Sequence, residues 1–298
     1  MKYTDKQTAF ALLPKRKRDS HKGDYGKAAI LAGSIEYTGA AYLATLACLR
    51  SGAGYTTLYV PKGILPYYFL KAPEALLRPL SDGERAVFSE KTFKGLLNYD
   101  SIAYGMGMGV SLDVALGAKY LIQNFTGKLI LDADGLNSLA FYGKENLNVL
   151  FLQKKCDVLI TPHAKEFSRL SGVCVEEIVA NGQTYAENFA RDCAINVLLK
   201  GATSVITNGR QTYLNSTGNS GQAKGGSGDV LSGVIAGLCA QGASAFDGGI
   251  LGAYLTGKTA ELIVSERGEY SMLASDIAEN LSKAFLFVTE NTDNGGGE

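Results

Sequence analysis

Short hydrophobic runs alternate with longer stretches in which apolar residues recur every three or four positions, from about residue 28 onward. Runs of four or five apolar residues are typical of strands covered on both faces, and the longer pattern is typical of amphipathic helices. The predicted strands are 28–31, 56–60, 101–104, 128–131, 157–160, 195–199 and 204–207, and the predicted helices between them are 40–50, 113–123, 164–170 and 176–191.

This alternation predicts right-handed βαβ units, and therefore an α/β fold with a doubly wound, mostly parallel central sheet and helices on both faces. The last ninety residues differ, because three helical patterns at 229–240, 245–264 and 274–289 follow with no clear strand between them. No repeat or low-complexity linker divides the chain. We therefore expect one domain over 1–298, with a frayed tail at 290–298, and ligands bound beyond the carboxyl ends of the strands.

The charge balance disfavours several function classes. The chain has 29 basic and 29 acidic residues, so a nucleic acid or a membrane surface gains no electrostatic attraction. No uncharged apolar stretch reaches the ~20 residues that a membrane span needs. The one dense basic run, 15–18, is better explained as a solvated surface than as a ligand site.

The five cysteines show no C-x-x-C spacing, which argues against a disulfide framework and a zinc site. Each lies in or beside an apolar stretch, so we expect buried free thiols, which suit a reducing cytosol. The N-terminus has no apolar core of a secretory signal. We therefore expect a cytoplasmic protein without nucleic-acid or membrane partners.

The strongest chemical signal is a glycine-rich segment, 218–228, that runs directly into an apolar helical pattern. Successive N–H groups of Gly225, Gly226, Ser227 and Gly228 can converge on an anion, and the helix N-terminus adds partial positive charge. Asp229 follows in the first turn, where it serves either as a helix-stabilising carboxylate or as a general base. The helix dipole predicts a lowered pKa for Asp229, and therefore a weak base at rest.

Four further segments end predicted strands. Thr161-Pro162-His163-Ala164-Lys165-Glu166 places His163 and Glu166 three residues apart, on one helix face; His163 is either a ligand contact or a satisfied polar residue. Asp132 and Asp134 can orient a ligand hydroxyl or a metal-bound water, or Asp134 can cap the next helix. The remaining two segments are Leu199-Lys200-Gly201-Ala202-Thr203-Ser204, with a cation and hydroxyls suited to phosphate, and Tyr104-Gly105-Met106-Gly107-Met108-Gly109, a weak match to a dinucleotide fingerprint.

The order of these segments resembles the ribokinase-like superfamily, and more narrowly the family of ADP-dependent NAD(P)H-hydrate dehydratases. The resemblance runs from about residue 14 to 288. Besides the segments above, the matching motifs are His21-Lys22-Gly23, Ile30-Leu31-Ala32-Gly33-Ser34, Tyr37-Thr38-Gly39-Ala40-Ala41, Arg50-Ser51-Gly52-Ala53-Gly54, Pro73-Glu74-Ala75, Leu131-Asp132-Ala133-Asp134-Gly135-Leu136-Asn137 and Ala274-Ser275-Asp276.

The resemblance implies an enzyme that restores NADH or NADPH from the form hydrated at C6 of the nicotinamide ring, with ADP (ATP in some relatives) converted to AMP and phosphate. Asp229 would be the catalytic base. It also implies Mg²⁺, held best by Glu166 through water, and a homotetramer. By resemblance, the hydrated dinucleotide would contact Ala41, Gly107, Gly109, His163 and Asp229, and the adenine nucleotide would contact Lys200, Gly201, Ala202, Thr203, Ser204 and Gly228.

The sequence departs from the family pattern at several points. Ser220, Gln222, Lys224 and Ser227 differ from the usual N-P-G-M-A-T-G-G-T-G-D, and we expect Lys224 to add a cation near the phosphate. Thr256 stands where a histidine is common. Many relatives carry an additional epimerase domain, for which we expect no room here. The alternative is a ribokinase-like small-molecule kinase for a vitamin precursor or sugar, although such kinases have an Asn at the position of His163.

Overall fold

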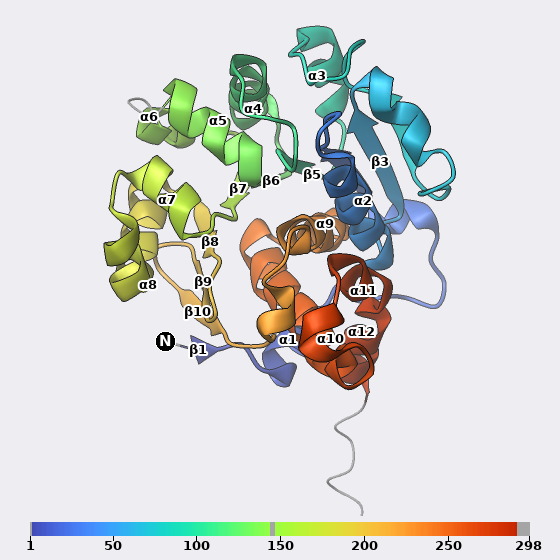
Figure 1. Ribbon diagram of the computed structural model, residues 1–298, viewed down its shortest axis with the longest axis vertical. Coiled ribbons are helices and arrows are strands. Elements are labelled where there is room, and N and C mark those ends of the chain that lie inside the picture. Colours follow the sequence, from blue (N-terminus) through green and yellow to red (C-terminus); the bar gives the residue numbers. More distant parts are fainter. Residues whose placement is uncertain (1, 144–146, 291–298) are drawn as a thin grey trace, which may run out of the picture.

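A ten-stranded sheet forms the centre of the protein in the computed structural model, which describes residues 2–143 and 147–290 (Figure 1). The strands follow the order β1-β10-β9-β8-β7-β6-β5-β2-β3-β4. Their bounds are β1 Lys2–Tyr3, β2 Lys27–Leu31, β3 Tyr55–Val60, β4 Leu76–Pro79, β5 Ser101–Tyr104, β6 Lys128–Leu131, β7 Asp157–Ile160, β8 Asn196–Leu199, β9 Ser204–Thr207 and β10 Thr212–Asn215.

The sheet is mostly parallel, as predicted. Only β9 runs against its neighbours, since it pairs antiparallel with both β8 and β10. The chain winds outward from β2 through β3 to β4, and then returns to place β5 on the other side of β2. This reversal between β2 and β5 is the topological switch point, where the loops after the two strands diverge and leave a crevice for a ligand.

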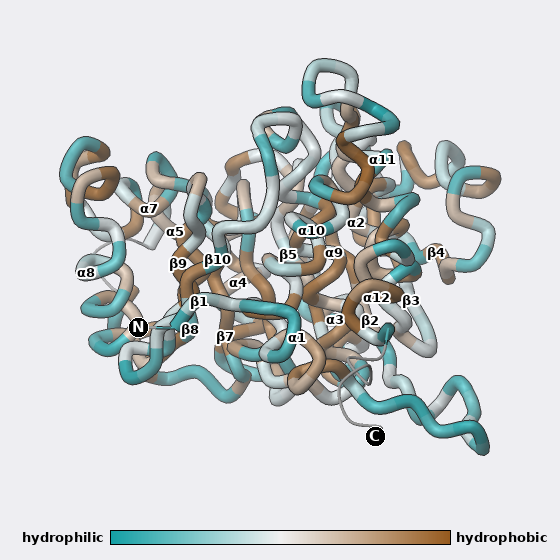
Figure 2. The backbone as a smooth tube through the Cα atoms, turned by 90° about the horizontal axis from the view of Figure 1, so that it is seen from below, coloured by the Kyte–Doolittle hydropathy of each residue, from teal (hydrophilic) through white to brown (hydrophobic). Residues whose placement is uncertain are grey.

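Helices cover both faces of the sheet and bury separate cores against it. One face carries α3 Glu90–Leu96, α4 Leu112–Asn124, α5 Ala133–Gly143, α6 Leu147–Leu152, α7 Ala164–Ser171 and α8 Val175–Cys193. The other carries α2 Thr38–Arg50, α9 Ser227–Ala240 and α10 Ala245–Ser271, with α1 Lys6–Leu12, α11 Ala274–Glu279 and α12 Leu281–Thr289 outside them. Figure 2 shows the hydrophobic residues concentrated in the strands and in α9 and α10, and hydrophilic residues in the outer loops.

Glycines on α9 allow it to pack directly on the backbone of α2. A Cβ added at Gly233 would lie 2.1 Å from the carbonyl oxygen of Ala44, and one at Gly237 would lie 2.7 Å from that of Cys48. Real Cβ atoms do not approach a backbone atom so closely, so the two helices can pack at this distance only if both positions are glycine. This packing fixes where the N-terminus of α9 meets the carboxyl edge of the sheet.

The structure corrects several expectations about local structure. The pattern missed β1, β4 and β10 because they are short and lie toward the sheet edges, where a strand need not be apolar on both faces. The expected helix 274–289 divides at Asn280 into α11 and α12, and α10 extends beyond 264 to Ser271. Cys174 is exposed, whereas the other four cysteines are buried. Residues 291–298 of the expected tail lie outside the described residues.

Within 2–143 and 147–290, no helix is long and apolar enough to span a bilayer.

Candidate active site

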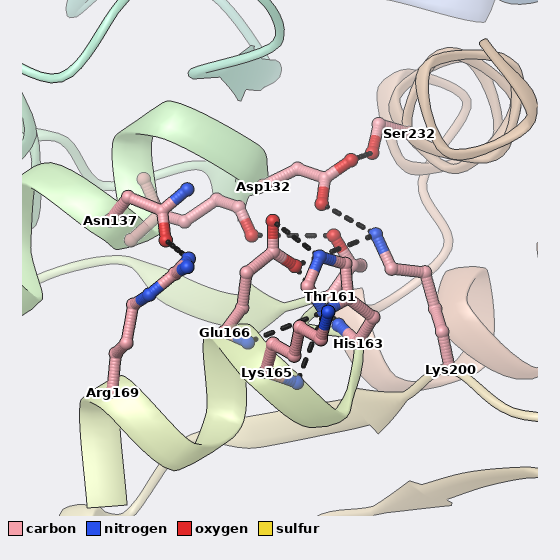
Figure 3. Close-up of polar contacts among 10 residues, drawn as sticks. Asp132, Asn137, Thr161, His163, Lys165, Glu166, Arg169, Lys200 and Ser232 are labelled. Atoms are coloured by element: carbon pink, nitrogen blue, oxygen red, sulfur yellow. Dashed lines mark hydrogen bonds and ion pairs between the residues drawn. The ribbon is translucent and has the colours of Figure 1, made fainter. Parts of the chain in front are cut away.

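Three neighbouring strands deliver polar side chains to the carboxyl edge of the sheet. Asp132 follows β6, His163 follows β7, and Lys200 follows β8 (Figure 3). A short parallel bridge continues the β7–β8 pairing from His163 to Lys200. The predicted strand ends therefore do meet, as parallel strands require.

Asp132 is the buried centre of this group. Its side chain is 1 % exposed, and its Oδ1 accepts a hydrogen bond from Lys200 Nζ at 2.8 Å. The Ser232 hydroxyl, from the second turn of α9, donates to Oδ2 at 2.8 Å. Burial lowers the pKa of Lys200, but the carboxylates of Asp132 and Glu166 outweigh it and raise that pKa overall. Lys200 therefore stays charged beside the start of α9, with its ammonium close to Gly228.

The residue between the two carboxylates, Ala133, has an unusual backbone conformation. Its φ is +48°, a left-handed value that costs a non-glycine residue on the order of 1 kcal/mol or more. The turn directs Asp132 into the core and leaves Asp134 in the first turn of α5, where its Oδ2 accepts the N–H of Gly109 at 2.8 Å. Asp134 thus anchors the loop after β5. Neither sequence-based interpretation, a ligand contact or a helix cap, included this role.

His163 and Glu166 form a reciprocal cap at the start of α7. The Nδ1 of His163 accepts the N–H groups of Lys165 and Glu166 at 3.1 and 3.3 Å, while Glu166 Oε2 accepts the N–H of His163 at 2.9 Å. Burial and the charge of Lys200 lower the pKa of His163. Since Nδ1 accepts hydrogen bonds, the proton of the neutral ring lies on Nε2. This N–H donor lies 3.5 Å from Glu166 Oε1 on a half-exposed side chain.

The glycine turn leads into α9, with Gly226 as the residue before the first turn and Asp229 in that turn, as predicted. Gly226 has φ +97°, and a Cβ there would lie 2.5 Å from the Leu43 side chain. Ser227 Oγ is buried and has no hydrogen-bond partner among the described residues. Unsatisfied hydroxyl and N–H groups at a helix N-terminus are what an oxyanion would complete.

The expectation of a lowered pKa for Asp229 is wrong. Burial, followed by the negative charge of Asp132, raises the pKa of Asp229 to about 7, although Lys200 acts in the opposite direction. The helix dipole is worth a fraction of a kcal/mol to about 1 kcal/mol at most such positions, whereas removing a carboxylate from water costs more. A carboxylate that titrates near neutral pH is a competent general base.

A cavity of about 630 Å³ lies on one side of the turn, between the β8–β9 loop, the segment after β10 and α10. Five of the six residues predicted to hold the nucleotide line it: Lys200, Gly201, Ala202, Ser204 and Gly228. Ser227 lines it as well. Thr203 does not; it lines a neighbouring cavity beside α8, which shares Lys200, Gly201 and Ala202 with this one. Sequence reasoning missed Asn215 and Thr217, which also line the cavity. Asn215 ends the unpredicted strand β10, and Thr217 follows it.

Of the departures from the family pattern, Ser220, Gln222, Ser227 and Thr256 line this cavity, and Lys224 does not. Thr256 lines the cavity, and its hydroxyl bonds to the carbonyl oxygens of Gly252 and Ala253 in its own helix. Lys224 donates to the carbonyl oxygen of Tyr270 at 2.6 Å, so its ammonium is turned toward the end of α10.

The other predicted substrate contacts lie near the switch point. A Cβ at Gly107 would lie 2.7 Å from that of Tyr37 and 2.9 Å from that of Ala40, so the loop after β5 touches the start of α2. Gly109 is held to α5 through Asp134. Ala41 is fully buried against Gly33. Ser232 was not predicted, although its position three residues after Asp229 places both on one side of α9.

Comparison with known proteins identifies the family. The family model described as NAD(P)H-hydrate dehydratase matches residues 28–283. The chain belongs to the NAD(P)H-hydrate dehydratase family. Among solved structures of this fold, the ADP/ATP-dependent NAD(P)H-hydrate dehydratase of Bacillus subtilis, co-crystallised with ATP and Mg²⁺, superposes with a TM-score of 0.83 at 30% identity, covering 96% of this chain and 98% of that one.

Two further relatives define the fold and the extent of the match. A ribokinase-like superfamily protein of Enterococcus faecalis has a TM-score of 0.79 at 25% identity, covering 98% and 97% of the two chains, which confirms the ribokinase-like fold. The bifunctional NAD(P)H-hydrate repair enzyme of Thermofilum pendens is 34% identical over 284 residues, or 94% of this chain. The chain therefore spans only about half of that relative, since the match covers 53% of the relative's length.

Proposed function

We propose that the protein dehydrates the 6-hydrated form of NADH or NADPH, with ADP as phosphoryl donor, and so returns the reduced dinucleotide. The observation that carries the proposal is the position of Asp229. Its carboxyl, with a pKa near 7, lies in the first turn of α9, directly after the glycine turn. Lys200 forms an ion pair with Asp132 and also lines the 630 Å³ cavity. Family membership supports the same reaction.

The chemistry follows from the poor leaving ability of hydroxide. Asp229 accepts the proton of the C6 hydroxyl as its oxygen attacks the terminal phosphorus of ADP, and AMP departs. Phosphate then leaves C6 while the neighbouring carbon loses a proton, which rebuilds the ring double bond. The N–H groups of Gly225, Gly226, Ser227 and Gly228 stabilise the charge that develops on the transferred phosphoryl oxygens. Lys200, held by Asp132, adds a fixed positive charge beside Gly228.

We assign the adenine nucleotide to the cavity lined by Lys200, Gly201, Ala202, Ser204 and Gly228, and the hydrated dinucleotide to the side of His163. The Nε2–H of neutral His163 can donate to a substrate oxygen. Ala41 and Thr203 are assigned supporting places, behind Gly33 and behind the nucleotide loop respectively.

Magnesium suits the nucleotide phosphates of this site. No cluster of three or more His, Cys, Asp or Glu side chains suited to a metal occurs in the described ranges, and Mg²⁺ commonly binds through water and phosphate rather than in an all-protein cage. The Oε1 of Glu166 accepts no backbone N–H among the described residues and lies 3.5 Å from His163 Nε2. It would hold such an ion through water, and the ion would neutralise phosphate charge.

The test is recovery of absorbance of the reduced nicotinamide ring after mixing the protein with NADH-hydrate or NADPH-hydrate and ADP, with ATP as a parallel arm. We expect AMP and phosphate in equal amounts to the recovered dinucleotide. Asp229→Asn should lose at least ~10²-fold in rate while it keeps the fold, in line with the loss of a general base. An unchanged rate would reduce Asp229 to a helix-stabilising residue, and no recovery with either nucleotide would contradict the dehydratase.

The small-molecule kinase is the competing activity of the same fold. A kinase would consume ATP with a vitamin precursor or sugar and yield a stable phosphate ester, without any gain in reduced-ring absorbance. The family match favours the dehydratase. We also propose that the protein acts in the cytosol and forms a homotetramer. Light scattering of the purified protein tests the homotetramer.

A further inference from the structure

A second cavity, of about 460 Å³, lies between α5, α7 and the loop after β5. Its lining residues are Val110, Asn137, Ala140, Phe141 and Arg169, none of which lines the nucleotide cavity. Its walls are largely apolar, and Phe141 is 76% exposed at its rim. Its exposed ring extends the apolar wall of the cavity to the surface.

Arg169 places a positive charge at this cavity without a carboxylate in ion-pair contact among the described residues, although its charge also acts on Glu166 one turn earlier on α7. Its Nη1 donates to Asn137 Oδ1 at 2.7 Å, and no carboxylate lies within 4.0 Å of its guanidinium in the described part of the chain. The hydrogen bond to Asn137 holds the guanidinium in one orientation and leaves its other N–H groups free to bind. A fixed guanidinium beside an apolar wall matches a ligand that combines a phosphate with an aromatic base.

The second cavity adjoins the catalytic groups on the side away from the nucleotide cavity. Arg169 lies on α7 six residues after the cap residue His163, roughly 9 Å along the helix axis. Its charge contributes to the lowered pKa of His163, after burial and the charge of Lys200. Val110 directly follows Gly109, whose N–H binds Asp134. In Figure 3, Arg169 and Asn137 lie at one end of the group, Lys200 and Ser232 at the other, with His163 and Glu166 between them.

We propose that this second cavity binds the adenosine half of the hydrated dinucleotide, with a phosphate on Arg169 and the adenine against Phe141. The inference rests on the proposed function, because it assigns the part of the substrate remote from the reacting ring. The phosphate is either one of the bridging pair, present in both dinucleotides, or the 2′-phosphate of the NADPH form. Either phosphate would bind the same guanidinium. Only binding of the 2′-phosphate makes Arg169 a determinant of preference for the NADPH form over the NADH form.

The experiment compares Arg169→Gln with Arg191→Gln. Arg191 is a matched control, since it also donates to an asparagine, Asn188, at 2.8 Å, but lies on α8 outside the cavity. We expect Arg169→Gln to raise KM for the hydrated dinucleotide by ~10-fold or more, as for loss of a charged hydrogen bond, with kcat and the KM for ADP within about 2-fold. Arg191→Gln should match the wild type.

The two substrates distinguish the two phosphates. An equal rise for NADH-hydrate and NADPH-hydrate assigns Arg169 to the bridging phosphates, and a rise for NADPH-hydrate alone assigns it to the 2′-phosphate. An unchanged KM for both, in an active enzyme, overturns the inference.

A wild-type protein inactive on both hydrates would instead refute the proposed function. In that case, direct calorimetric titration of NAD⁺ and NADP⁺ into the two variants still tests the cavity, and equal affinities in Arg169→Gln and wild type would refute it.

Discussion

The raised pKa of Asp229 has a measurable consequence for stability. A carboxyl whose pKa rises from its ordinary 3.8 to about 7 in the folded protein loses about 4 kcal/mol of folding free energy once it ionises. Asparagine keeps the shape of the side chain and removes the charge. We therefore expect Asp229→Asn, without nucleotide, to be about 2–4 kcal/mol more stable than wild type at pH 8, the lower figure allowing for water that reaches the ionised group.

The sign of the pH dependence follows from the proton count. Between pH 3.8 and about 7 the folded protein holds a proton that the unfolded chain has released, so wild-type stability falls as pH rises through this window. The neutral variant lacks this dependence. The advantage of Asp229→Asn should therefore fall to less than half of its pH 8 value at pH 5, and nearly vanish below pH 4.

Urea or guanidinium unfolding at pH 5, 6, 7 and 8 measures this difference, and thermal unfolding checks it, since about 2 °C per kcal/mol gives a shift of roughly 4–8 °C at pH 8. Asp82→Asn is the control, because the side chain of Asp82 is fully exposed. A variant no more stable than wild type at pH 8, or one with the same advantage at pH 5, would refute the argument that burial of Asp229 sets its pKa.

Three further predictions test the packing and charges around the site. The kcat/KM of the proposed reaction should rise with pH through about 7 as Asp229 ionises. Asp132→Asn should move the midpoint of this rise to lower pH by about one unit, and an unmoved midpoint would contradict the effect of the Asp132 charge on Asp229. Lys200→Met should cost about 3–5 kcal/mol of unfolding free energy because it strands the buried carboxylate, and adding Asp132→Asn should recover most of it; a loss below about 1 kcal/mol would be inconsistent with the buried pair. Gly233→Ala should cost about 2–3 kcal/mol by pushing α9 off α2, whereas Gly95→Ala, with no atom within 4 Å of the added Cβ, should change stability by less than about 1 kcal/mol.

The periodic pattern determined the central strands and the class of fold, because residues buried on both faces of a parallel sheet must be apolar in short runs. β2, β3 and β5 to β9 all lie where this pattern predicts. The same pattern cannot find β1, β4 or β10, whose pairing depends on the rest of the sheet being in place. A helix after Asp134 was expected without bounds, but not its start at Ala133, whose backbone conformation only the surrounding structure can impose.

Much of the site could be predicted for the same reason as the fold. The carboxyl ends of parallel strands lie at one edge of a sheet, so Asp132, His163 and Lys200 were expected at the same edge. The strand order β6-β7-β8 makes them neighbours. The sequence by itself therefore determined which chemistry the edge carries: a glycine turn with Asp229 after it, and polar residues after three adjacent strands.

Only the tertiary structure decided the state of those groups. The pKa of Asp229 depends on how deeply α9 buries it and on the nearby Asp132, two residues ninety-seven positions apart in the sequence. The hydrogen bonds that Asp132 accepts from Lys200 and Ser232 likewise join segments distant along the chain. The same holds for the bond from Arg169 to Asn137. Desolvation and Coulomb energies depend on distance in space and on depth below the surface, neither of which a linear pattern of residues specifies.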